Sequence, residues 1–179
     1  VVAPADAFQT RALLPQIIEA KTPVYFRLLF PTMKNITEKF VSDYGKLQVL
    51  VEGDDLTIFS YGQTLHPCLK VASELNKLGQ SCRVVNVHTI KPLETEAMIA
   101  ILEKTKHAVV VEEHNSYGGL GSIVAQIAAE YCPTKINFIN TNDKFGLTGL
   151  PSEILDHFGL SYNNILKVCK DIINEKWKK

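Results

Sequence analysis

One short stretch, EEHNSYGGLGS at residues 112–122, combines two acids, a histidine and three glycines. It follows the apolar run HAVVV and precedes IVAQIAAEYC, so it lies where a strand is expected to pass into a helix. Open α/β proteins bind ligands at such places, beyond the carboxyl ends of their strands. The stretch is therefore open to three interpretations: a phosphate-binding loop, a catalytic cluster or a tight polar corner.

A phosphate-binding loop would need the glycines to match the dinucleotide pattern GxGxxG. Gly119 and Gly121 match its first two positions, and Asp143 lies near the end of the next predicted strand, where a ribose-binding acid would sit. Val124 replaces the third glycine, and the two acids at the start of the stretch would oppose a pyrophosphate unless they point away. These departures disfavour a nucleotide-binding oxidoreductase.

A polar corner explains the same residues through backbone geometry. Gly118 and Gly119 would permit a turn with positive φ, and Gly121 would let the helix approach the sheet closely. The two glutamates and His114 would then face a cleft or an interface. A histidine beside carboxylates tends to stay protonated, which makes His114 a candidate proton donor or anion contact, although an isolated histidine is more often structural.

Composition limits the class of protein. The 179 residues suffice for one well-buried domain, or for one domain and part of another. The formal net charge is zero and the basic residues are scattered, which argues against nucleic-acid binding. No apolar run is long enough to span a membrane, and no signal sequence opens the chain.

The four cysteines, Cys68, Cys82, Cys132 and Cys169, lie far apart in or beside apolar segments and lack metal-binding spacing. Buried reduced thiols, no metal site and a cytoplasmic location are therefore expected.

From residue 56 onward, apolar strand-like runs alternate with helical segments. Strands are predicted at 56–62, 82–88, 107–114 and 135–141, and helices at 64–78, 96–105, 119–131, 151–159 and 163–177. Such alternation predicts an α/β fold with a mostly parallel sheet and helices on both faces.

The N-terminal part is less regular and predicts a fragment of another α/β domain. A helix is expected at 5–20, begun by Asp6 and interrupted by Pro15, followed by a strand at 22–30. The turn-rich segment that follows reads as a linker with short strands such as LQVLVEG, and a domain boundary is expected near 40–52. Because the chain opens with Val1 and no lead-in, it is expected to be a piece of a longer protein.

Several loops, taken together in order and spacing, resemble the back half of the transketolase family of thiamine-diphosphate enzymes. The matching segments are APAD at 3–6, TPVYFRL at 22–28, LTIFSYG at 56–62, RVVNVHTIKPLE at 83–94, VVVEEHNSYGGLGSIVAQ at 109–126 and DKFGLTG at 143–149. The resemblance implies that residues 1–35 are the tail of the pyrimidine-binding domain, 36–55 a linker and 56–179 the transketolase C-terminal domain.

What the resemblance implies for function is the transfer of two-carbon ketol units between sugar phosphates. In such enzymes thiamine diphosphate and a divalent metal, Mg²⁺, are held by an N-terminal domain that this chain lacks. The chain alone is therefore expected to bind no cofactor and to be inactive. Its role would be dimer or inter-domain assembly at the flank of the active site, with a second copy or a complementary N-terminal section as partner.

The resemblance also assigns candidate residues. His114 is the catalytic candidate. Arg27 is the candidate contact for the substrate phosphate, and as a strand residue next to Leu28 it could equally be paired structurally. Two departures bear on the site: Phe30 stands where family members often have an arginine that binds this phosphate, and Gln9 stands where they often have an acid. The predicted loop or interface residues, expected at an inter-domain or inter-subunit surface, are Glu112, Glu113, Gly118, Gly119, Gly121 and Asp143.

Three alternatives stay open from the sequence. The chain would also suit part of a deoxyxylulose-phosphate synthase, the beta subunit of a 2-oxo acid dehydrogenase, or a non-catalytic α/β module for assembly or regulation.

Overall fold

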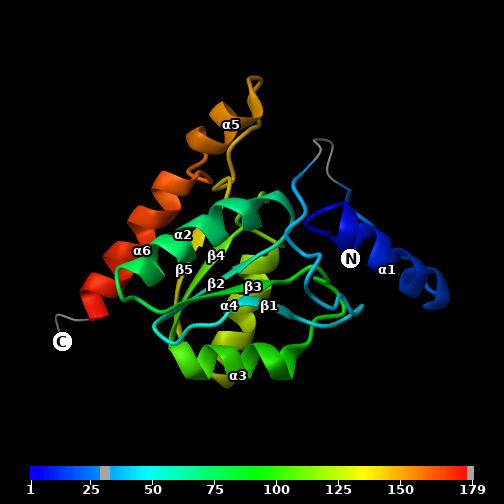
Figure 1. Ribbon diagram of the computed structural model, residues 1–179, viewed down its shortest axis with the longest axis horizontal. Helices are drawn as coiled ribbons and strands as arrows, with labels where there is room; N and C mark the ends of the chain where they lie inside the picture. The colour runs from blue at the N-terminus through cyan, green and yellow to red at the C-terminus, as the bar shows by residue number, and fades with distance from the viewer. Residues whose placement is uncertain (29–32, 177–179) are drawn as a thin grey trace.

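The structure of the protein, a computed structural model, describes residues 1–28 and 33–176 (Figure 1). Its strands are β1 (Gln48–Val51), β2 (Leu56–Ser60), β3 (Cys82–Asn86), β4 (His107–Val111) and β5 (Lys135–Ile139). Its helices are α1 (Ala7–Glu19), the short 3₁₀ helix η1 (Gly62–Thr64), α2 (Leu65–Lys77), α3 (Thr95–Thr105), α4 (Leu120–Tyr131), α5 (Pro151–His157) and α6 (Tyr162–Lys176). In the described residues no helix has both the length and the apolar character needed to cross a membrane.

The five strands form one sheet in the order β1-β3-β2-β4-β5. The pairs β2–β3, β2–β4 and β4–β5 are parallel, and only β1 runs antiparallel to its neighbour β3. The prediction of a mostly parallel sheet is therefore confirmed. Parallel strands align their carboxyl ends, so the loops after β2, β3, β4 and β5 meet at one edge of the sheet.

Helices cover both faces of the sheet, as predicted (Figure 1). Alternate residues of each strand point to opposite faces. Ile58 and Val84 therefore pack with α2 and α6, whereas Phe59 and Val85 pack with α3 and α4. Three of the four free cysteines lie in the first of these cores, and all four are buried, as expected.

The segment before β2 differs from the prediction in one respect. The strand expected at 22–30 is reduced, over the described residues 22–28, to a single bridge between Phe26 and Val2. Tyr25 and Leu28 are 66% and 59% exposed, so no second neighbour completes a ladder on this side. The short strand predicted within LQVLVEG does form, as β1, and pairs with β3.

Asp6 fastens α1 to the segment that leads to β1. Its carboxylate caps the helix by accepting a bond from the Gln9 amide (2.8 Å), as predicted for the helix start. It also accepts bonds from the amides of Ile36 (2.7 Å) and Thr37 (2.9 Å) and from the Thr37 hydroxyl (2.8 Å). Burial alone would raise the pKa of Asp6, but these hydrogen bonds outweigh it and hold the pKa below its usual range.

Gln9, one of the two departures from the family pattern, has a structural explanation. Its side chain is fully buried, and its Nε2 donates to Ser42 Oγ (3.2 Å) and Gln48 Oε1 (3.1 Å). Asn86 Nδ2 on β3 donates to Gln9 Oε1 (3.1 Å). A carboxylate has no hydrogen to donate, so the neighbours of Gln9 require an amide at this position.

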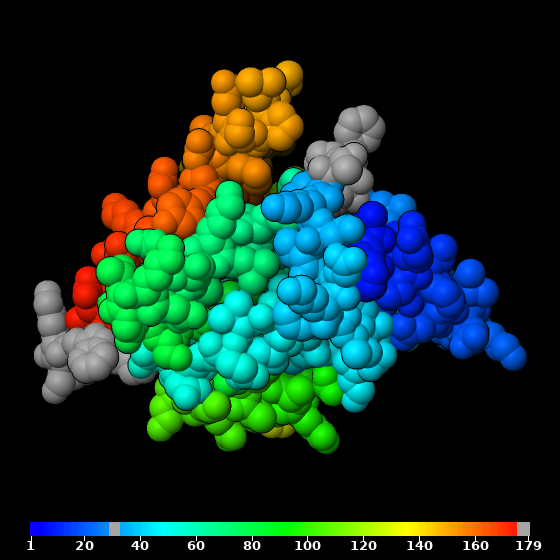
Figure 2. Space-filling view, viewed as in Figure 1, coloured from blue at the N-terminus to red at the C-terminus, as the bar shows by residue number. Residues whose placement is uncertain are grey.

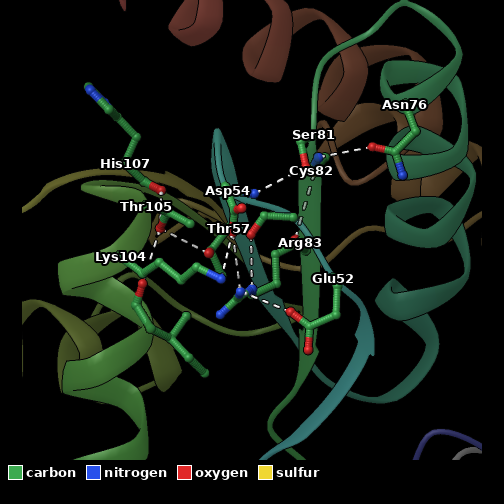
Figure 3. A network of polar contacts seen from close by, with 12 residues as sticks. Glu52, Asp54, Thr57, Asn76, Ser81, Cys82, Arg83, Lys104, Thr105 and His107 are labelled. Atoms are coloured by element: carbon green, nitrogen blue, oxygen red, sulfur yellow. Dashed lines mark hydrogen bonds and ion pairs between the residues drawn. The ribbon is translucent and has the colours of Figure 1, made fainter.

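A second polar network lies at the opposite edge of the sheet, at the amino ends of its parallel strands (Figure 3). Arg83, only 5% exposed, donates from Nε to Gly53 O (3.1 Å) and pairs with Glu52 (2.9 Å) and Asp54 (3.6 Å). Lys104 of α3 also reaches Asp54 (2.8 Å). The charged groups satisfy one another, so this network joins the β1–β2 turn to β3 and α3 and is structural.

Candidate functional site

The corner after β4 is built around Glu112, which is 1% exposed. Its two carboxylate oxygens accept hydrogen bonds from the backbone amides of Leu120 and Gly121, both at 2.8 Å. Amides in the first turn of a helix have no partner within the helix, and the dipole favours negative charge there. The carboxylate therefore fills the N-terminus of α4 inside the protein, whereas the sequence predicted that it would face a cleft or an interface.

The glycines of the corner make room for this carboxylate. A Cβ atom on Gly119 would lie 2.4 Å from Glu112 Oε2, and one on Gly121 would lie 2.9 Å from Cδ1 of Phe138. Gly118 has a φ of +77°, which confirms the predicted positive-φ turn there. The same prediction for Gly119 is wrong, because its φ is −87° and close approach to Glu112 explains the glycine instead.

The dinucleotide interpretation is excluded by this geometry. A pyrophosphate would need the α4 amides that Glu112 already occupies. The other residue assigned to that site, Asp143, accepts a hydrogen bond from Asn115 Nδ2 (2.6 Å) and shapes a turn. For the same reason the corner does not fit the diphosphate of thiamine diphosphate. Residues 1–28 and 33–176 also contain no cluster of three or more His, Cys, Asp or Glu suited to a metal ion.

Tyr61, which follows β2, completes the buried side of the corner. It is 3% exposed, and its hydroxyl donates to Glu112 Oε2 at 3.4 Å. Burial raises the pKa of this hydroxyl strongly, and the Glu112 charge raises it further. Tyr61 lies in the family-like segment LTIFSYG at 56–62, but nothing in the sequence distinguished it from an ordinary core aromatic.

The outer side of the corner joins Glu113 to two distant segments. Arg27 Nη2 lies 3.1 Å from Glu113 Oε2, and Gln63 Nε2 of η1 donates to the same oxygen at 2.6 Å. The Arg27 and Glu113 side chains are 31% and 37% exposed. The structure thus brings together two predicted residues that are 86 positions apart, and adds Gln63, which sequence reasoning did not select.

His114 is exposed, and the expected pairing with the neighbouring carboxylates does not form, because both bind other groups. Its ring Nδ1 lies 3.2 Å from the Asn115 carbonyl oxygen. Its own carbonyl oxygen accepts bonds from the Thr141 amide (3.0 Å) and hydroxyl (2.9 Å). The backbone of His114 therefore holds the loop after β5, while its imidazole is exposed at the surface.

The loop after β5 leads into an exposed arm, which we define as residues 142–150 together with α5. It stands out from the body in Figures 1 and 2. Asn142 and Asp143 begin it with left-handed φ angles of +53° and +55°. Phe145 is 97% exposed, and α5 has no buried residue. A groove of about 840 Å³, lined in part by Tyr117, Phe138 and His157, lies beside the arm.

Phe30, the second departure from the family pattern, lies outside the described residues. His88, in the loop after β3 at this edge, is fully buried, and its Nδ1 lies 3.0 Å from the Thr89 hydroxyl. Its carbonyl oxygen accepts a bond from the Ala3 amide (2.8 Å), so His88 helps to attach the N-terminal segment. Burial lowers the pKa of its imidazole from 6.5 to about 4.

Comparison with known protein families identifies residues 45–165 as a transketolase C-terminal domain. The chain therefore belongs to the transketolase family. The match begins just before β1 and ends within α6, so it includes the whole sheet and the Glu112 corner.

Similarity to individual proteins extends over nearly the whole chain. The chain is 36% identical over 177 residues to the 6-deoxy-6-sulfo-D-fructose transketolase subunit SqwH of Clostridium sp. (strain MSTE9), covering 98% of this chain and 55% of that protein. It is 32% identical to a subunit of the apulose-4-phosphate transketolase of Phocaeicola vulgatus, with 98% and 56% covered. The chain thus spans about half the length of these curated relatives.

The beta subunit of the pyruvate dehydrogenase E1 component of Staphylococcus epidermidis is 35% identical over a shorter stretch, which covers 73% of this chain and 41% of that protein. Among solved structures, a split-gene transketolase described as an inactive beta4 tetramer superimposes with a TM-score of 0.90 at 32% identity. That comparison covers 97% of this chain and 57% of the other.

The Glu112 corner predicts a specific loss of stability. In Glu112→Gln, one oxygen is replaced by an NH₂ group that faces a backbone N–H, so one buried donor loses its acceptor. The free energy of unfolding should fall by about 2 kcal/mol, measured by urea denaturation. The adjacent, half-exposed Glu113→Gln is the matched control and should change it by less than about 0.5 kcal/mol. Equal stability of the two variants would contradict the assigned role of Glu112.

His88 predicts a pH dependence of stability. Its folded-state pKa of about 4 lies below the unfolded value of 6.5, so the unfolded chain binds the proton first. The stability due to neutral His88 is complete above pH 6.5 and decreases as the pH falls toward 4, by up to about 3 kcal/mol. Denaturation at several pH values should show this slope reduced in His88→Gln. It should be kept in the control His157→Gln, whose side chain is exposed; an unchanged slope in His88→Gln would count against the assignment.

Proposed function

We propose that the chain is the C-terminal section of a transketolase-type enzyme that transfers two-carbon ketol units between sugar phosphates. In this proposal it completes the assembly and flanks the active site. The observation that carries the proposal is the similarity to transketolase subunits over 98% of the chain, which includes the N-terminal segment as well as the matched domain. The Arg27–Glu113 pair is a physical link between these two parts.

The division of the chain follows the same proposal. Residues 1–35 are the tail of a pyrimidine-binding domain, 36–55 connect it to the next domain, and 56–179 form the C-terminal domain. Because β1 pairs with β3, the connecting segment also contributes a strand to the sheet of that domain.

Thiamine diphosphate and Mg²⁺ are proposed to be held by the complementary N-terminal section. The residues present support this placement, because Glu112 occupies the helix N-terminus that would otherwise suit a diphosphate. What this chain contributes is the rim formed by Arg27, Gln63, Glu113 and His114.

Arg27 is proposed to contact the anionic group of the sugar substrate. The names of the two transketolase subunits specify a sulfo sugar and a sugar phosphate, both of which carry an anion remote from the reacting carbons. A guanidinium suits either anion, because its N–H groups match two oxygens at once.

The proposed partners are the complementary N-terminal section and a second copy of the assembled unit, in the cytoplasm. The exposed arm supports an assembly role, because its apolar side chains Phe145, Leu147 and Leu150 are 97%, 51% and 63% exposed. The similar split-gene transketolase forms a beta4 tetramer, which supports self-association of this kind of chain. An interface here would also cover the EEHNSYGGLGS loop.

A 2-oxo acid dehydrogenase beta subunit is the second candidate, favoured by the similarity to the pyruvate dehydrogenase component. That similarity covers 73% of this chain, against 98% for the transketolase subunits. The longer match favours ketol transfer, and a substrate test separates the two activities.

The experiment combines this chain with the complementary section encoded upstream or in an adjacent gene. With thiamine diphosphate and Mg²⁺, the assembled protein should transfer a ketol unit from D-xylulose 5-phosphate to an aldose, and either section alone should not. Pyruvate in place of the ketose is the control for the dehydrogenase alternative. Turnover by this chain alone, decarboxylation of pyruvate instead of ketol transfer, or no activity in the assembled protein would contradict the proposal.

A further inference from the structure

Arg27 is held in place from two directions. Its backbone amide donates to Val2 O (2.8 Å), which fixes the 22–28 segment against the first residues of the chain. Its guanidinium Nη2 lies 3.1 Å from Glu113 Oε2, at the carboxyl end of β4. The side chain of Arg27 therefore connects the N-terminal segment to the loop that follows β4.

Glu113 is itself anchored. Gln63 Nε2 donates to the same oxygen, Oε2, at 2.6 Å, and Gln63 lies in η1, directly after Gly62 with its φ of +60°. Because η1 leads directly into α2, the position of this amide is set by a helix that packs on the sheet. The Glu113 carboxylate is thus held by η1 independently of its contact with Arg27.

The pair leaves most of the guanidinium available. A guanidinium has five N–H donors, and the contact with Glu113 uses Nη2 alone. Nε and Nη1 retain three donors, and the side chain is 31% exposed. Both bidentate edges of a guanidinium include one hydrogen of Nη2, so a one-point contact through a single Nη2 hydrogen orients the planar group and leaves the other edge complete for a phosphate or sulfonate.

Stability does not account for the pair. Ion pairs between partly exposed side chains contribute little to the stability of the fold. An arginine side chain, however, loses rotamer entropy when it is fixed, and a binding site gains affinity when that loss has occurred before the ligand arrives. The arrangement is therefore suited to binding rather than to holding the fold together.

We propose that Glu113, fixed by Gln63, is a positioning residue that orients Arg27 for the anionic group of the sugar substrate. The inference rests on the proposed function of Arg27 and extends it. It makes the C-terminal domain a participant in substrate recognition, through a carboxylate that does not itself touch the substrate.

Two variants separate orientation from charge. Glu113→Gln keeps an oxygen that can accept from both Arg27 and Gln63 but removes the negative charge, whereas Glu113→Ala removes both. If Glu113 orients Arg27, Glu113→Gln should resemble the wild type and Glu113→Ala should not. If Glu113 only neutralises Arg27, both variants should bind anions more tightly than the wild type.

The first measurement follows the Arg27 Nε–H signal by ¹⁵N NMR in this chain, assigned by its disappearance in Arg27→Lys, with inorganic phosphate as the probe. The signal should be sharp in the wild type and Glu113→Gln, and broadened by exchange in Glu113→Ala. Phosphate should shift it with similar affinity in the first two. A sharp signal and unchanged affinity in Glu113→Ala would overturn the proposal. An ordered Arg27 that does not respond to phosphate would instead contradict its anion-binding function.

The second measurement uses the assembled two-section enzyme with D-ribose 5-phosphate and D-ribose as aldose acceptors. Glu113→Ala should raise KM for the phosphorylated acceptor about fivefold, leave kcat within twofold, and leave KM for ribose unchanged, with Glu113→Gln near wild type. A fall in kcat for both acceptors, or a lower KM in both variants, would overturn the positioning role. Equal KM values for both acceptors in the wild type would contradict the anion contact itself.

Discussion

The contact between the Glu112 carboxylate and the amides of Leu120 and Gly121 determines the rest of the corner. It requires glycine at 119 and 121, because a Cβ at either position would collide with neighbouring side-chain atoms. It also sets the direction of the next residue. Successive side chains on an extended chain point to opposite sides, so the burial of Glu112 directs Glu113 outward toward Arg27 and Gln63. The buried Glu112 carboxylate therefore fixes the start of α4 on the inside and directs Glu113 toward Arg27 and Gln63 on the outside.

The outer rim connects parts of the chain that are distant in sequence. Arg27 comes from the segment after α1, Gln63 from η1, and Glu113 from the loop after β4. On the other side of the corner, the His114 backbone holds the loop that begins the exposed arm. Because the sheet aligns the carboxyl ends of its parallel strands, these loops form one surface. The proposed function assigns assembly and substrate contact to that surface.

Periodicity predicted the sheet, its covering helices and the cap at Asp6, because these depend on local pattern and burial. The strand predicted at 22–30 does not form over the described residues 22–28. A strand needs a neighbouring strand to pair with, and this segment forms only a single bridge with Val2. Contacts such as Arg27–Glu113, 86 positions apart, leave no local signal. The sequence also gave no sign that Glu112 points inward, because a glutamate at a strand end is usually solvated. The resemblance identified the family, whereas the structure explains why residue 9 is a glutamine and why the corner contains glycines.

The most direct test of the central claim is an NMR titration of this chain with thiamine diphosphate and Mg²⁺, following the backbone amides of Leu120 and Gly121. Because Glu112 already occupies these donors, neither amide should shift, and both should exchange slowly with solvent before and after the addition. Shifts of these amides that saturate at micromolar cofactor would contradict the account. They would show that the corner is a diphosphate site after all.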